Sequence, residues 1–184
     1  MRTFWLTMVV LLGAGAVDAQ QLFLGAGVGT SWEFDPPALP SKSTYHSSDA
    51  VSSAFLAMRL DEDTQLRVRV ANLPFQAPRS AASGPVEAWP GRLRAMTVGV
   101  DYFMTGVVGN VVFSGGVGGY QLDLKAAHPP AGMEATRFGW YLGVGEWFRF
   151  SRHLQGTLEF TMDRADQVGK PTVVTAAIGL AYGF

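Results

Sequence analysis

The chain has 184 residues, and its 14 basic and 15 acidic residues nearly cancel to a formal net charge of −1. This balance gives no electrostatic case for a nucleic-acid partner, and the absence of cysteine excludes a disulfide framework or a thiolate site. The 22 glycines and the aromatic content of 12%, with no apolar stripe at helical spacing, favour an all-β protein.

The first 19 residues have the pattern of a secretory signal peptide. Arg2 supplies a positive start, residues 4–16 form an uncharged and mostly apolar run, and Val17 and Ala19 are small residues at the −3 and −1 positions of a cleavage site. The run is shorter than the roughly 20 residues that a membrane-spanning helix needs. We therefore expect cleavage after Ala19, export, and one mature domain over residues 20–184.

Alternation of apolar with small or polar residues predicts eight strands in the mature chain. The expected strands span residues 21–33, 50–60, 64–73, 93–103, 110–124, 135–150, 154–162 and 171–184. The third is the most regular, since apolar residues alternate with Gln65, Arg67 and Arg69. The fifth changes phase near Gly118 and Gly119, where we expect a β-bulge.

Long and short connections between these strands alternate along the chain. Long ones follow the first, third, fifth and seventh strands and include the proline-containing loops 34–49 and 74–92, whereas short turns follow the second, fourth and sixth strands. Transmembrane barrels have this asymmetry, with short periplasmic turns and longer outer loops. A secreted β-sandwich is the alternative, but it gives no reason for the asymmetry.

Outward-facing aromatic residues gather near both ends of the predicted strands, as they do at the two interfaces of a barrel in a bilayer. The outer group is Trp32, Phe138 and Trp140, and the periplasmic group is Tyr102, Phe148, Phe150, Tyr182 and Phe184. Together, the alternation, the connections and the aromatic groups predict an all-β fold, an eight-stranded antiparallel up-and-down transmembrane β-barrel.

Two segments resemble a known family. Residues 143–150 read Gly-Val-Gly-Glu-Trp-Phe-Arg-Phe and lead through a polar turn into residues 158–160, Leu-Glu-Phe; the chain closes on Leu180, Tyr182 and Phe184 on one face of a strand. This pattern resembles the outer-membrane β-barrel domain superfamily, the eight-stranded barrels similar to OmpA and OmpX. The resemblance implies an outer-membrane location, contact with outer-membrane lipids, and recognition of the closing strand by the barrel-assembly machinery.

One position departs from the pattern. Strict alternation would point Glu146 at lipid, where a carboxylate is unfavourable near the bilayer midplane and less so near an interface. A register shift would instead place Trp147 on the outside. The sequence leaves the facing of both residues open.

Seven charged residues fall on the predicted inward face: Glu33, Arg59, Arg67, Arg69, Asp101, Arg149 and Glu159. An eight-stranded barrel is just wide enough for side chains to fill it, so buried charges there must pair. We expect a paired polar network that stiffens the barrel, in preference to a gate or a narrow ion path.

No constellation for catalysis, metal binding or cofactor binding is recognisable. His46, His128 and His153 fall in two outer loops and a periplasmic turn, so they are not expected to converge on a metal ion. His46 precedes two serines and an aspartate, and some outer-membrane barrels modify lipid A with such residues. The loop position of His46 argues against that activity.

We therefore expect a non-enzymatic barrel with a structural or surface-interaction role in the bacterial envelope. Loops 34–49 and 74–92, which carry Tyr45 and Trp89, are the candidate surface for an extracellular ligand. A channel for small solutes or hydrophobic compounds, similar to OmpW, is the alternative. A lipid-modifying enzyme is less favoured.

Overall fold

The computed structural model describes residues 21–34, 46–47, 50–79, 87–105, 109–124, 135–167 and 172–184. The predicted signal peptide and its cleavage site lie outside these ranges. Within them, no helix has both the length and the apolar character that crossing a membrane requires.

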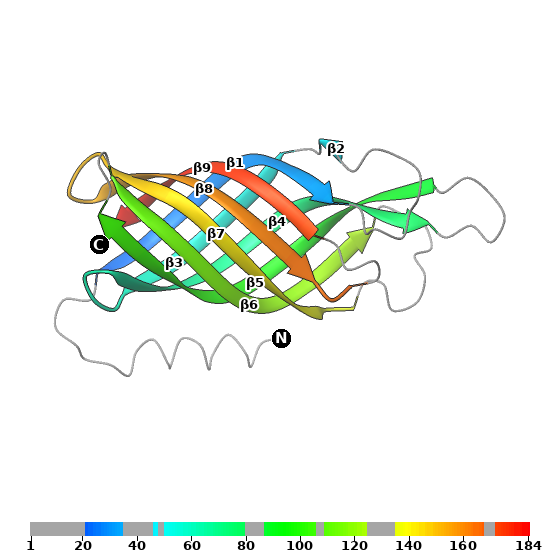
Figure 1. Cartoon of the computed structure of the whole chain (residues 1–184), viewed down its shortest axis with the longest axis horizontal. Coiled ribbons are helices and arrows are strands. Elements are labelled where there is room, and N and C mark those ends of the chain that lie inside the picture. Colours follow the sequence, from blue (N-terminus) through cyan, green and yellow to red (C-terminus); the bar gives the residue numbers. More distant parts are fainter. Residues whose placement is uncertain are drawn as a thin grey trace.

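The described residues form nine strands: β1 Leu22–Phe34, β2 His46–Ser47, β3 Val51–Arg59, β4 Thr64–Arg79, β5 Glu87–Thr105, β6 Asn110–Leu124, β7 Arg137–Arg149, β8 Leu154–Ala165 and β9 Thr172–Gly183. Each long strand pairs antiparallel with the next along the chain, and β1 pairs with β9, so the sheet closes on itself (Figure 1). β2 is a two-residue addition to the end of β1 and not a wall strand. The predicted eight-stranded antiparallel up-and-down barrel is confirmed.

The two ends of the barrel differ in their connections. Four residues each join β3 to β4, β5 to β6 and β7 to β8, and we call this side the short-turn end; the opposite side is the long-loop end. Both ends of the barrel chain lie at the short-turn end, where the Phe184 N–H donates to the Leu22 carbonyl. There the Asp61 carboxylate accepts a hydrogen bond from the Asp63 N–H (2.9 Å), which lowers the pKa of Asp61.

The hairpin of β4 and β5 extends much farther than predicted. Pairing continues from Thr64 opposite Tyr102 to Arg79 opposite Glu87, so much of the expected loop 74–92 is strand. We call residues 74–79 and 87–90 the arm; it projects beyond the other strands in Figure 1. The loop prediction was wrong because prolines were taken as strand breakers, whereas proline is compatible with a strand edge.

The bulge expected near Gly118 and Gly119 is absent. β6 pairs with β5 in one unbroken register from Gly91 opposite Leu124 to Thr105 opposite Asn110. The apolar residues change sides because the interior changes along the barrel: Phe113 faces outward, while Tyr120 faces an apolar part of the interior. In β6, the apolar residues therefore move from the outward to the inward face because the barrel interior becomes apolar, and the backbone register does not change.

The register of β7 decides the two positions that the sequence left open. Trp147 points into the barrel and is only 2% exposed. Glu146 lies on the outer face, opposite Val111 of β6 and Leu158 of β8, close to the short-turn end. Its carboxylate therefore lies near an end of the strand, where a charge on the outer wall is less unfavourable than at mid-height.

Small residues on β1 make room for large ones inside the barrel. Gly25 faces inward, and a Cβ atom added there would overlap the ring of Phe55. Phe55 is itself buried against Trp147, with 5.7 Å between the ring centroids, so it has little freedom to move away. Glycine at position 25 is therefore a packing requirement.

We expect Gly25→Ala to lower the free energy of unfolding by about 1–3 kcal/mol, because the added methyl group overpacks the interior. Urea unfolding of the refolded protein in lipid vesicles, followed by gel mobility without heating, measures the change. Gly115→Ala is the matched control: its Cβ would lie 3.3 Å from the flexible end of Leu142 on the outer wall, so we expect a change within about 0.5 kcal/mol. In a Phe55→Leu background the cost of Gly25→Ala should shrink; an undiminished cost would contradict the assigned contact.

Candidate functional site

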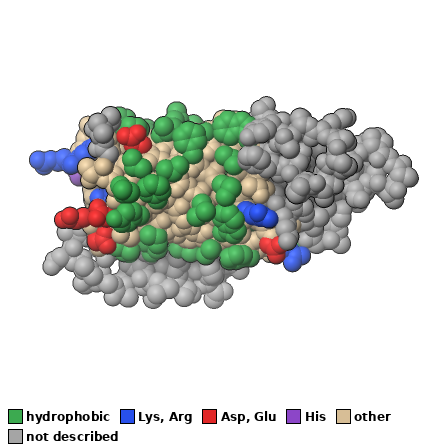
Figure 2. Space-filling model, viewed as in Figure 1, with side chains coloured by type: hydrophobic (Ala, Val, Ile, Leu, Met, Phe, Trp, Pro, Cys, Tyr) green, Lys and Arg blue, Asp and Glu red, His purple; other side chains and the backbone are tan. Residues whose placement is uncertain are grey.

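The outer wall of the barrel is covered by apolar side chains. Large residues on the outward face of every long strand except β3 remain exposed, among them Leu24, Val70, Val98, Phe113, Leu142, Phe160, Ile178 and Leu180. Figure 2 shows hydrophobic side chains over the middle of the barrel and charged side chains near its ends. Water-soluble monomers rarely expose apolar surface this extensive, whereas the lipid-facing wall of a membrane barrel requires it.

Aromatic side chains lie on this outer face toward both ends of the strands. At the short-turn end, Phe150 and Phe184 are 64% and 67% exposed, and the rings of Tyr182 and Phe184 are 5.1 Å apart. At the long-loop end, Phe138 is 62% exposed and Trp140 is half-buried on the same face of β7. These positions are those that interfacial aromatic residues occupy in membrane barrels.

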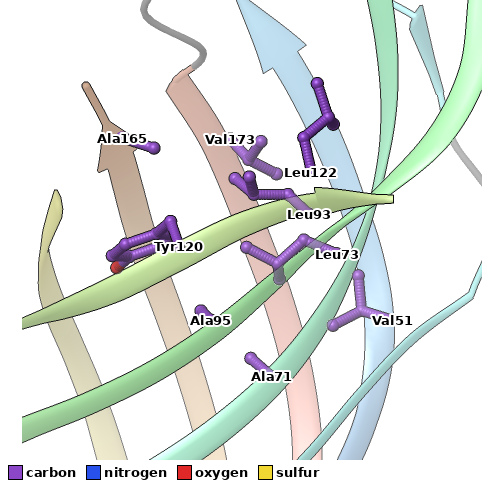
Figure 3. Close-up of a cluster of buried hydrophobic side chains, with 9 residues drawn as sticks. All are labelled: Val51, Ala71, Leu73, Leu93, Ala95, Tyr120, Leu122, Ala165 and Val173. Carbon is purple, nitrogen blue, oxygen red and sulfur yellow. The ribbon is translucent and has the colours of Figure 1, made fainter. Parts of the chain in front are cut away.

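The interior at the long-loop end is filled by an aliphatic plug. Nine buried residues from β3, β4, β5, β6, β8 and β9 meet there (Figure 3). They are Val51, Ala71, Leu73, Leu93, Ala95, Tyr120, Leu122, Ala165 and Val173. The leucines and Val173 are at most 1% exposed, so their side chains fill this section of the interior.

An aromatic plug fills the interior near the short-turn end. Its buried residues are Phe23, Phe55, Ala57, Phe103, Val112, Trp147 and Ala181. Trp147 is central, because its ring lies 5.9 Å from that of Phe23 and 5.5 Å from that of Phe103, both edge to face. Such edge-to-face pairs stabilise beyond the area they bury.

Two arginines of β4 cross the polar section between the plugs. Arg67 pairs with Glu159 of β8 through two hydrogen bonds of 3.0 and 2.9 Å, and its Nε lies 2.7 Å from Asp101 of β5. Its guanidinium also lies over the ring of Phe55, 4.5 Å from the centroid. The two carboxylates balance the positive charge of the buried guanidinium, and the aromatic ring packs against its face.

Arg69 makes the second bridge. It donates hydrogen bonds of 3.0 and 2.9 Å to the two carboxylate oxygens of Asp163 in β8. The Tyr120 hydroxyl donates to the same carboxylate at 2.8 Å, and the Arg69 guanidinium lies over the ring of Tyr141 at 4.9 Å. Because β4 and β8 stand four strands apart in either direction around the barrel, both bridges cross its full width.

The structure does not bring all the predicted interior charges together. Arg59 is half-buried at the short-turn end and lies over the ring of Phe103 (4.5 Å), away from the bridges. Arg149 is on the inward face but exposed, and it donates to the Ser151 carbonyl at 3.3 Å. The side chain of Glu33 lies outside the described residues. The interior network therefore has its centre at Arg67, Arg69, Asp101 and Glu159.

The sequence analysis missed Asp163, the partner of Arg69. It assigned this residue to a loop, because the seventh predicted strand ended at Met162. β8 continues to Ala165, and Asp163 keeps the inward phase of Glu159 and Thr161. Extending the alternation past Met162 would have placed this carboxylate inside the barrel.

The predicted C-terminal signal residues lie side by side on the outer face. Leu180, Tyr182 and Phe184 are 54%, 48% and 67% exposed. The His153 ring stacks on Tyr182 at 5.7 Å, and its Nδ1 lies 2.8 Å from the Gly183 carbonyl oxygen. The closing strand is therefore tied both to β1 and to the turn before β8. Its recognition by the assembly machinery stays a prediction.

Among the described residues, no group of three or more histidine, aspartate or glutamate side chains has the arrangement of a metal site. Of the three histidines, only His153 has a described side chain, and it lies in the turn after β7. The structure describes no side chains for Tyr45, Trp89, His46 and His128. The expected loop surface and the arrangement around His46 therefore stay predictions.

We expect Asp163→Ala to lower the free energy of unfolding by about 3–5 kcal/mol, because it leaves Arg69 buried without its carboxylate. Urea unfolding in lipid vesicles measures the loss. The exposed Arg94–Asp123 pair is the control, and Asp123→Ala should change stability by less than about 1 kcal/mol. Arg69→Met combined with Asp163→Leu should recover most of the stability. A double variant as unstable as Asp163→Ala would show that the unpaired charge is not the cause.

The fold of this chain matches solved structures, although its sequence matches no described family. No protein-family model matches the chain, and a search of curated proteins finds no match. Neisserial surface protein A (NspA) is 7% identical with a TM-score of 0.65, over 89% of this chain and 97% of that one. OprG of Pseudomonas aeruginosa is 13% identical with a TM-score of 0.60, over 90% and 96%.

Ail, the attachment invasion locus protein of Yersinia pestis, was solved in complex with the heparin analogue sucrose octasulfate. It is 11% identical with a TM-score of 0.56, over 90% of this chain and 99% of that one. At these identities the likeness concerns the fold. The resemblance drawn from residues 143–160 and the closing strand is confirmed at that level: the chain has the fold of the eight-stranded outer-membrane barrels.

Proposed function

We propose that this protein is a non-conducting outer-membrane barrel with a structural or surface-interaction role. The observation that carries the proposal is the filling of the interior. An aliphatic plug, two transverse arginine–carboxylate bridges and an aromatic plug follow one another along the barrel. A barrel of eight strands has little room for a water path beside such side chains.

The outer wall supports the membrane location. Its exposed apolar side chains have no favourable surroundings in water, and closure of the sheet satisfies the backbone groups that lipid would leave unpaired. Two solved barrels with the same fold support it as well, because OprG is named as an outer membrane protein and NspA as a surface protein. Export through the predicted signal peptide is consistent with this location.

The long-loop end supports a surface role. Loops on a rigid scaffold commonly carry binding, and here a filled, cross-braced barrel holds the arm and the expected loop 34–49 at one end. Ail, whose name describes attachment, shares the fold. We propose residues 34–49 and 74–92 as the surface for an extracellular ligand and the last strand as the segment read during assembly.

Two other functions are less favoured. A channel for small solutes or hydrophobic compounds would have to pass both plugs and both bridges. A lipid-modifying enzyme would rely on His46, and the loop position expected for this residue argues against that activity. We therefore propose no catalytic residues, no cofactor and no nucleic-acid partner.

Planar-bilayer recording should show no sustained single-channel current for the folded protein, because apolar side chains close both ends of the interior. Heat-modifiable mobility on a denaturing gel identifies the folded fraction before it is added. Detergent alone and a boiled sample are the controls. Reproducible unitary currents that follow the folded fraction would contradict the proposal and favour the channel.

Protease accessibility in intact cells should establish which end faces outward. A protease site inserted between residues 80 and 86 should be cut, because the long-loop end is proposed to lie outside. The same site inserted at residues 61–63 is the matched control and should be cut only after the outer membrane is opened. The reverse pattern would overturn the proposed orientation, and cutting of both sites in intact cells would overturn the membrane location.

A further inference from the structure

The arm extends past the strands that flank it. The β3–β4 ladder ends at Ser52 opposite Asn72, and the β5–β6 ladder ends at Gly91 opposite Leu124. Beyond these points, no strand in the described part of the chain pairs with the outer edges of residues 74–79 and 87–90. Free strand edges are templates for pairing with another chain.

Hydrogen bonds near the short-turn end show which way the backbone groups of β4 and β5 point. The Phe103 N–H donates to the Asp63 carbonyl at 2.7 Å, across the β4–β5 ladder. The Leu60 N–H donates to the Thr64 carbonyl at 2.9 Å, across the β3–β4 ladder. In an antiparallel ladder the N–H and C=O of one residue point to the same neighbour, and successive residues alternate.

The register transfers this alternation to the arm without interruption, since pairing of β4 with β5 shows no slip as far as Arg79 opposite Glu87. Odd-numbered residues of β4 therefore bond to β5, and even-numbered residues point toward the other edge. By the same alternation, even-numbered residues of β5 point away from β4. The outward positions of the arm are residues 74, 76, 78, 88 and 90.

Proline occupies three of these five positions. Pro74 lies opposite Arg92, Pro78 opposite Ala88, and Pro90 opposite Gln76. Proline has no N–H to donate, so each of the three removes an outward donor while leaving the β4–β5 ladder intact. Gln76 and Ala88 retain the outward N–H groups. The two edges of the arm are therefore poor in donors, while its internal ladder is complete.

We propose that Pro74, Pro78 and Pro90 prevent the arm from pairing, edge to edge, with the arm of a second copy of this chain. A second copy is the strand donor that is always present, and it carries the same arm at the same end of its barrel. Strand addition needs successive donors and acceptors along an edge, and each edge of the arm keeps its carbonyl acceptors but lacks successive donors. The inference depends on the register alone and stands apart from the proposed surface role.

The test replaces all three prolines with threonine in the full chain, which restores the outward donors with a residue that favours strands. Sedimentation of the folded protein in detergent micelles measures its oligomeric state. We expect the unaltered protein to be monomeric and the triple variant to form dimers or larger species as concentration rises. A monomeric triple variant, or an unaltered protein that already dimerises through the arm, would overturn the proposal.

A matched pair of variants tests the geometry even if the triple variant fails to fold. Gln76→Pro places a further proline at an outward position, so the arm should keep its resistance to limited proteolysis. Ala77→Pro, one residue away, removes an N–H that bonds across the arm opposite Trp89, so the arm should lose this resistance. Equal sensitivity of the two variants would contradict the assigned directions and the proposal with them.

Discussion

The pairing of β1 with β9 is the contact on which the rest of the structure depends. It runs from Phe23 opposite Gly183 to Phe34 opposite Thr172 and leaves no open edge in the barrel wall. With an apolar outer surface, an open edge would expose backbone groups where no water can satisfy them. Closure by eight strands also sets the width of the interior, and this width determines how side chains must fill it.

Different strands contribute small and large side chains to the interior. β1 and β9 contribute small inward residues such as Gly25 and Gly179, while β4 and β7 contribute long ones such as Arg67 and Trp147. The arginines of β4 can therefore reach carboxylates on β8, directly opposite. Plugs on either side of these bridges keep the charges away from bulk water, which strengthens the pairing and makes the loss of one partner costly.

The local alternation of residues predicted correctly, for most positions, which side chains face into the barrel, but it gave a wrong bulge in β6 and a wrong end to β4. The inward phase of Gln65, Arg67 and Arg69 follows from the two-residue period of a strand, and all three are buried. The same reasoning placed a bulge in β6, because it assumed that apolar residues would keep to one face. It also ended β4 at its first proline, because a single sequence does not show that Pro74 and Pro78 lie at a free edge.

The amino-acid sequence by itself determined the number of wall strands, the face that most residues take and the asymmetry of the connections, because each depends on neighbours within a few residues. Only the tertiary structure decided which charges meet. Arg67 and Glu159 are 92 residues apart in the chain, and Arg69 and Asp163 are 94 apart. These pairs form because β4 and β8 stand opposite each other once β1 and β9 close the barrel. A local sequence pattern does not show which distant strands will face each other.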